Sequence, residues 1–137
     1  MITAVDSNIL IDIFWADPEF GPRSLAALEA CTTQGGLIAC EVVWAEVAAG
    51  FQQPTAANEA MRQAGVRFVP LDARMALLAG DAWRGYRRRA RRRDRLLADF
   101  LIGAHAAIGA DRLLTRDRGS YSRYFKDLEI LDPTRAR

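Results

Sequence analysis

Four carboxylic acids stand beside or within apolar stretches of this sequence, where a charged side chain is costly to bury. Glu46 lies in the mostly apolar segment 42–50, and Asp99 opens the mostly apolar segment 100–109. Asp6 directly follows a predicted strand, and Asp117 comes two residues after another. Because a buried carboxylate is unfavourable unless a positive charge compensates it, we expect these acids to share a cation.

Oxygen ligands without sulfur or imidazole select hard cations, so a site built from these acids would take Mg²⁺ or Mn²⁺. The alternative is structural, in which a buried acid pairs with Arg84, Arg88 or Arg95. The recurrence of such acids at predicted strand and helix ends favours the metal. A carboxylate-bound metal activates water and stabilises charge that develops on a phosphate, which is the chemistry of phosphodiester cleavage.

The charge distribution adds a second feature. Residues 84–95 hold eight arginines and one aspartate, a local net charge of +7, while the rest of the chain has eleven basic and sixteen acidic residues and carries −5. The formal net charge of +2 therefore combines an acidic domain with one basic segment. Arginines held close to the acids can bind the backbone of a long polyanion.

Short apolar runs alternate with longer helical patterns along the 137 residues. Strands are expected at 2–5, 37–40, 66–69, 112–115 and 128–131, and helices at 8–14, 22–34, 41–51, 54–65, from residue 72 to the arginine-rich segment, and 99–109. This alternation predicts one α/β domain over residues 1–137, with helices on both faces of a central parallel sheet of four to five strands, a three-layer α/β/α architecture. Asp6 and Asp117 then lie beyond the carboxyl ends of parallel strands, where open α/β sheets bind ligands.

Other features narrow the class of protein. The N-terminal residues lack a basic segment followed by an apolar run, so we expect no signal peptide, and no apolar stretch is long enough to span a membrane. We therefore expect a cytoplasmic protein without a membrane partner. Cys31 and Cys40 match no zinc or redox spacing and are interpreted as small core residues.

Four motifs resemble, in order and spacing, those of the PIN-domain ribonucleases, above all the VapC-type toxins of bacterial and archaeal toxin–antitoxin pairs. The likeness spans residues 2 to about 131, and departs at Ala98, where close relatives often have proline. The motifs are VDSNIL at 5–10, VWAEV at 43–47, LADFLIGAHA at 97–106 and LLTRD at 113–117.

The resemblance implies a metal-dependent endoribonuclease that cleaves single-stranded or loop RNA, with Mg²⁺ or Mn²⁺ as cofactor. Its catalytic quartet would be Asp6, Glu46, Asp99 and Asp117. Asp6 and Asp99 would hold the principal metal, Glu46 would contribute directly or through water, and Asp117 would complete the site or bind a second ion. The residues that would orient these carboxylates are Ser7, Asn8 and Thr115.

The same resemblance implies a homodimer that is blocked by a cognate antitoxin protein. The arginines expected to hold the RNA substrate are Arg88, Arg91, Arg92, Arg93 and Arg95. Because like charges three and four residues apart repel on a helix, we expect the helix to end near residues 89–93 and a loop to lead back to Asp99.

Other interpretations remain at this point. A catalytically inactive PIN-like module that binds RNA or a partner protein is the main alternative, and the intact quartet argues against it. A haloacid-dehalogenase-type phosphatase would need an aspartate where Asn8 stands, and a receiver domain would need a lysine late in the sheet. We expect a structural role for His105, a solvated or helix-end position for Asp12, and either packing or a cleft position for Tyr121.

Overall fold

Five short parallel strands form the centre of the fold in the computed structural model, which describes residues 1–89 and 95–135. Their order in the sheet is β3-β2-β1-β4-β5, and every neighbouring pair is parallel. This arrangement confirms the predicted parallel sheet, although each strand has only three residues. The strands are β1 (Thr3–Val5), β2 (Leu37–Ala39), β3 (Val66–Phe68), β4 (Arg112–Leu114) and β5 (Glu129–Leu131).

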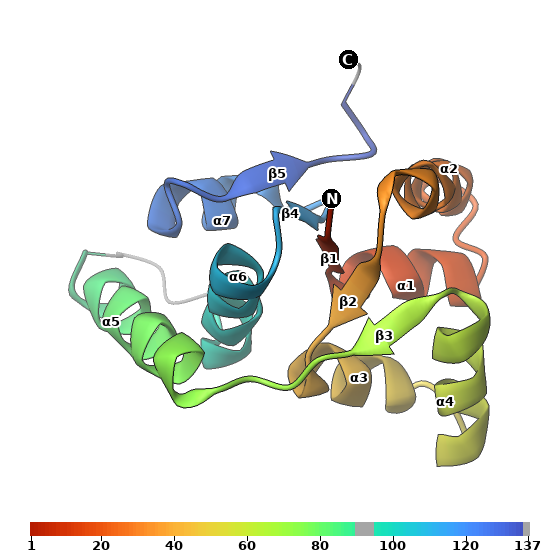
Figure 1. Ribbon diagram of the computed structural model, residues 1–137, viewed down its shortest axis with the longest axis horizontal. Coiled ribbons are helices and arrows are strands. Elements are labelled where there is room, and N and C mark those ends of the chain that lie inside the picture. The colour runs from red at the N-terminus through yellow and green to blue at the C-terminus, as the bar shows by residue number, and fades with distance from the viewer. Residues whose placement is uncertain (90–94, 136–137) are drawn as a thin grey trace.

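Helices flank the sheet on both sides, as the alternating sequence pattern predicts. The crossovers from β1 to β3 place α1, α2 and α4 on one side, and those from β3 to β5 place α5, α6 and α7 on the other, as right-handed connections require (Figure 1). Helix α3 contacts both α1 and α6. The helices are α1 (Ser7–Phe14), α2 (Gly21–Gln34), α3 (Glu41–Ala48), α4 (Pro54–Gln63), α5 (Ala73–Arg89), α6 (Leu97–Gly109) and α7 (Arg118–Tyr124).

The core is packed from the inner strands and the helix faces that cover them. All three residues of β1, β2 and β4 are buried, which fits strands covered on both faces. Cys31 and Cys40 are free and buried, so their predicted core role is confirmed. At Gly103 of α6 the helix approaches the ring of Phe125 so closely that a Cβ would lie 2.3 Å from it.

The sheet has its switch point between β1 and β4. From β1 the chain proceeds to β2 on one side, while β4 lies on the other side of β1 and leads to β5. The carboxyl ends of these adjacent strands are therefore the place where a ligand binds in this architecture. Asp6 follows β1 directly, and residues 115–117 follow β4.

Two helices differ from the sequence prediction. Helix α3 ends at Ala48 rather than at residue 51, and α7 is a helix that we did not expect. The sequence of α7, RGSYSRY, is largely polar. Among its described side chains only Tyr121 is buried and Tyr124 half-buried, so its apolar periodicity is too short to recognise.

Two further observations concern the helices. Helix α5 ends at Arg89, and the loop expected at 89–93 falls mostly outside the described residues. Among the helices described, none has the length and apolar character needed to cross a membrane.

Candidate functional site

Asp6 is the most deeply buried of the four predicted acids, with 4% of its surface exposed. Its carboxylate accepts hydrogen bonds from the Ser7 backbone N–H at 2.7 Å, from the Thr115 hydroxyl at 2.8 Å and from the Tyr121 hydroxyl at 3.0 Å. The Asn8 side-chain amide lies 3.5 Å from the same carboxylate. All of these donors are neutral, so none of them cancels the charge of Asp6.

The electrostatics of Asp6 follow from this burial. Removal from water raises the pKa of its carboxyl from 3.8 to about 6, although the hydrogen bonds from Thr115, Tyr121 and Ser7 act in the opposite direction, and the nearby charge of Glu46 raises it further. Within residues 1–89 and 95–135, no ion pair involves Asp6. A cation placed here would supply the charge compensation that the protein itself leaves out.

Tyr121 contacts Asp6 and is close enough to Asp99 and Asp117 for their charges to act on it. Its hydroxyl donates to Asp6, and its phenol pKa is raised above the usual value by burial and by the charges of Asp6, Asp99 and Asp117. The residue is 2% exposed, so Tyr121 both packs in the core and faces the site. The sequence left these two roles open, because only the fold shows that α7 returns to the end of β1.

Glu46 reaches the same region from α3 through Ser7. The Ser7 hydroxyl donates to Glu46 at 2.9 Å and lies 3.4 Å from Asp6, which links the two carboxylates. The expectation that Glu46 is embedded in apolar surroundings is wrong, because its side chain is exposed. Ala49 and Gly50, which lie three and four residues further along, follow the end of α3 and are exposed as well, whereas Val43, three residues before Glu46, is buried. Only part of the apolar stripe around Glu46 is therefore covered.

Asp99 stands in the first turn of α6. Its carboxylate accepts a hydrogen bond from the backbone N–H of Leu96 at 3.1 Å, which fixes the start of the helix. The position also suits a negative charge, because the backbone dipoles of a helix favour anions at its N-terminus. Asp99 is half-buried, as is Asp117.

Asp117 forms an ion pair with Arg95. The structural alternative stated from the sequence is therefore realised for this acid, whereas in the described part of the chain Asp6, Glu46 and Asp99 have no such pair. Arg95 also donates its backbone N–H to the Tyr86 hydroxyl at 2.9 Å, so its place is set by α5.

Thr115 and Asn8 join the ends of β1 and β4. The Thr115 hydroxyl donates to Asp6. The same hydroxyl oxygen accepts from the Asn8 side-chain amide at 3.3 Å and from the Asp117 backbone N–H at 3.0 Å. Asn8 in turn accepts from the Arg116 backbone N–H at 3.3 Å. These contacts place Asn8 and Thr115, together with Ser7, beside the Asp6 carboxylate.

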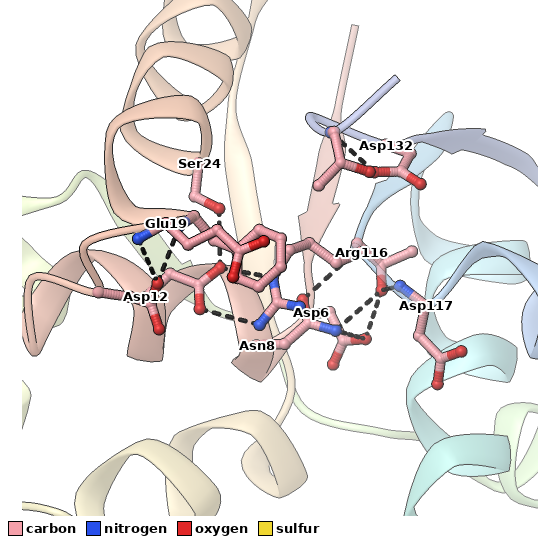
Figure 2. Close-up of polar contacts among 12 residues, drawn as sticks. Asp6, Asn8, Asp12, Glu19, Ser24, Arg116, Asp117 and Asp132 are labelled. Atoms are coloured by element: carbon pink, nitrogen blue, oxygen red, sulfur yellow. Dashed lines mark hydrogen bonds and ion pairs between the residues drawn. The ribbon is translucent and has the colours of Figure 1, made fainter.

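A buried ion pair behind the site was not predicted from the sequence. Asp12 is 3% exposed, and both of its oxygens accept from the Arg116 guanidinium, at 2.6 and 2.9 Å (Figure 2). Ser24 donates to the same carboxylate at 2.9 Å, and the guanidinium lies 4.0 Å from the centre of the Phe20 ring. The expected solvated or helix-end position of Asp12 is wrong, because α2 and Arg116 cover it.

The Arg116 side chain thus reaches toward Asp12 and not toward Asp117. In Figure 2 it extends toward Asp12, whereas the Asp117 carboxylate points in the opposite direction. The sequence does hold a signal for this pair, since Asp12 lies three residues after Ile9, which is buried on α1. Residues three apart share a helix face, so an acid at that spacing from a core residue is a candidate for burial.

His105 is not part of the site. It is 2% exposed, its ring nitrogen Nε2 is 2.8 Å from the backbone oxygen of Val69, and burial lowers its pKa. These contacts agree with the structural role expected from its position on α6.

The arginines predicted to hold RNA are placed only in part. Arg88 is exposed near the end of α5, and Arg95 contacts Asp117. Arg91, Arg92 and Arg93 lie outside the described residues, so their predicted role has no structural description.

The donor set suits a hard cation. It consists of carboxylate oxygens with no cysteine, and its innermost member, Asp6, is buried among neutral donors. Over residues 1–89 and 95–135, no three His, Cys, Asp or Glu side chains are grouped closely enough to form a complete ligand set. The residues present nevertheless fit such an ion in donor chemistry and in charge.

Comparisons with known proteins agree with this architecture. The family model of the PIN domain matches residues 3–126. VapBC-1 from nontypeable Haemophilus influenzae is similar in structure, with a TM-score of 0.73, 21% identity, and coverage of 98% of this chain and 100% of that one. FitAcB from Neisseria gonorrhoeae has a TM-score of 0.72 and 21% identity over 99% of this chain and 100% of that one.

A toxin–antitoxin complex from Klebsiella pneumoniae is also similar, with a TM-score of 0.71, 20% identity, and coverage of 98% of this chain and 99% of that one. At these identities the likeness establishes the fold alone. No curated protein matches the chain.

Proposed function

Because the chain belongs to the PIN domain family, we propose that it is a metal-dependent endoribonuclease that acts as the toxin of a toxin–antitoxin pair. The observation that carries the proposal is the buried Asp6, held by neutral donors only at the switch point of the sheet, where the charges of Asp99 and Asp117 also act on its partner Tyr121. Open α/β sheets bind their ligands at this point.

In this proposal Asp6 and Asp99 hold the principal ion, Mg²⁺ or Mn²⁺. Glu46 contributes directly or through water, and Asp117 completes the site or serves a second ion. When bound, the ion supplies an activated water and stabilises the charge that develops on the scissile phosphate. The residues that hold the carboxylates in place, through the hydrogen bonds they donate, are Ser7, Thr115 and Tyr121.

The substrate in this proposal is single-stranded or loop RNA, cleaved without a covalent intermediate. Support comes from the exposed arginines at the end of α5, Arg88 among them, because a concentration of positive charge attracts the phosphates of a polyanion. The RNA sequence that is cleaved depends on the shape of the cleft and its loops.

The proposed protein partners are a cognate antitoxin and a second copy of the chain. Support for the antitoxin comes from the fold shared with the complex from Klebsiella pneumoniae, which is described as a toxin–antitoxin complex. The second copy rests on the family resemblance. Co-expression with the neighbouring reading frame should suppress toxicity, and toxicity that persists would contradict the antitoxin.

Asp99→Asn tests the nuclease. We expect it to abolish RNA cleavage and to weaken Mn²⁺ binding in titration calorimetry, because the side chain loses its negative charge and one of its two oxygen ligands. The matched control is Asp127→Asn, which changes an exposed aspartate outside the quartet and should leave both measurements unchanged. Circular dichroism verifies that each variant is folded.

Full cleavage by Asp99→Asn would overturn the mechanism. Cleavage that is lost in both variants would show that the assay responds to net charge and not to the quartet.

A further inference from the structure

A basic hollow lies between α5 and α7, and none of the four acids lines it. Its volume is about 400 Å³, and Asp81 is the one acid among the described residues that line it. The cationic side chains that line it are Arg84, Arg88, Arg89, Arg123 and Lys126.

The positive charges of this basic hollow outnumber its one acid, Asp81, by five to one among the described residues that line it. None of the five cationic side chains takes part in an ion pair within the described part of the chain, and all five are exposed. The Arg123 guanidinium has a ring contact, 5.9 Å from the centre of Tyr124. Because like charges on neighbouring helix positions repel, this arrangement favours a bound anion.

The walls of the hollow are held by packing. Tyr124 is half-buried, and its ring meets Tyr86 edge-on at 5.7 Å and Phe100 at 5.3 Å between ring centres. These contacts tie α7 to α5 and α6. A site whose walls are already in place binds its ligand with a smaller loss of conformational freedom.

The hollow is connected to the four acids through α7. This helix begins directly after Asp117, and its residue Tyr121 donates to Asp6. Arg123, six residues beyond Asp117, lies about 9 Å further along at the rise of an α-helix. An extended polyanion can therefore occupy the hollow and the site together.

We propose that this basic hollow binds the phosphates of a single-stranded RNA on one side of the position where the strand is cleaved. The inference rests on the proposed function for the cleavage position, but the hollow itself needs no metal. Several cationic side chains side by side, Arg84 and Arg88 on α5 and Arg123 on α7, suit the repeated charges of a strand better than a single anion.

The test compares two triple variants in an Asp99→Asn background, which prevents cleavage during binding. One variant carries Arg84→Ala, Arg88→Ala and Arg123→Ala. Its matched control carries Arg23→Ala, Arg67→Ala and Arg74→Ala, which remove the same charge from exposed positions outside the hollow. Thermal melting checks that both are folded.

Fluorescence anisotropy measures binding of a short labelled single-stranded RNA at several salt concentrations without divalent metal. For three lost phosphate contacts, we expect affinity to fall about a hundredfold at about 0.1 M salt and the slope of log affinity against log salt to shrink by about 2. The control variant should keep the slope of its parent.

Equal slopes in both triple variants would overturn the proposal. The same titration with labelled poly-glutamate tests for an acidic protein partner. If the hollow variant binds RNA like its parent but no longer binds poly-glutamate, the hollow binds an acidic protein segment and the proposal is wrong. Normal RNA cleavage by the unmodified protein with unchanged RNA binding by the hollow variant refutes the hollow alone. If the hollow variant loses RNA binding but the unmodified protein cleaves no RNA, the hollow is supported and the nuclease is refuted.

Discussion

Replacing Asp12 with asparagine removes one charge from the buried pair that Asp12 forms with Arg116. Asparagine keeps the size of the side chain and one acceptor oxygen, but the two charged hydrogen bonds at 2.6 and 2.9 Å become at most one neutral-acceptor bond. The Arg116 guanidinium is then left beside Phe20 without its counter-charge.

The burial of the pair sets how much stability Asp12→Asn removes. Removing one partner of a fully buried ion pair costs about 3–5 kcal/mol. The Arg116 side chain is 26% exposed against 4% for Asp12, and water can therefore reach part of the guanidinium. We accordingly expect a loss of about 2 kcal/mol in the free energy of unfolding, which lowers the melting temperature by about 7 °C for a domain of this size.

The assay is urea denaturation followed by circular dichroism, with Glu59→Gln as the matched control. Glu59 also pairs with an arginine, Arg62, but at an exposed position, so the same chemical change should leave the transition unchanged within error. Adding Arg116→Met to Asp12→Asn should recover part of the lost stability, because no unpaired charge then remains.

Equal effects of Asp12→Asn and Glu59→Gln would refute this reasoning, since they would show that burial does not set the strength of the pair. The reasoning would also be refuted if the double variant lost as much stability as Asp12→Asn and Arg116→Met lose together when each is measured alone.

Three further predictions concern the site and its packing. Thr115→Val removes the hydroxyl that donates to Asp6 and should weaken Mn²⁺ binding about tenfold to a hundredfold in calorimetry, and unchanged affinity would contradict its role in orienting Asp6. Gly103→Ala places a Cβ 2.3 Å from the Phe125 ring and should lower the free energy of unfolding, measured by urea denaturation, by about 1–3 kcal/mol. Its control, Gly80→Ala, has nothing within 4 Å of the added Cβ and should raise that free energy by about 0.5–1 kcal/mol. Equal effects would contradict the close packing at Gly103. A chelator should abolish RNA cleavage and Mg²⁺ should restore it, while cleavage that continues in the chelator would contradict a metal-dependent reaction.

Much of the fold is predictable from local patterns. Short apolar runs locate the five strands, and the helices between them require parallel pairing. The helix α7 is not recognisable in this way, because Tyr121 and Tyr124 are the inward-facing apolar positions among its described side chains, and two residues do not establish a period.

The four acids are recognisable in the sequence because they stand beside or within apolar stretches, but their surroundings are not. Glu46 has apolar neighbours in sequence and is nevertheless exposed, while Asp12 was expected near solvent and is buried. Burial depends on which element covers a face, and that element comes from a distant part of the chain.

The sequence by itself determined the succession of strands and helices along the chain, the acids beside their ends and the concentration of arginines in residues 84–95. Only the tertiary structure decided that Tyr121 donates to Asp6 across 115 positions, that Arg116 pairs with Asp12 and that Arg95 pairs with Asp117. Periodicity is a property of neighbouring residues, whereas these contacts depend on how the sheet orders its strands and brings β1 beside β4.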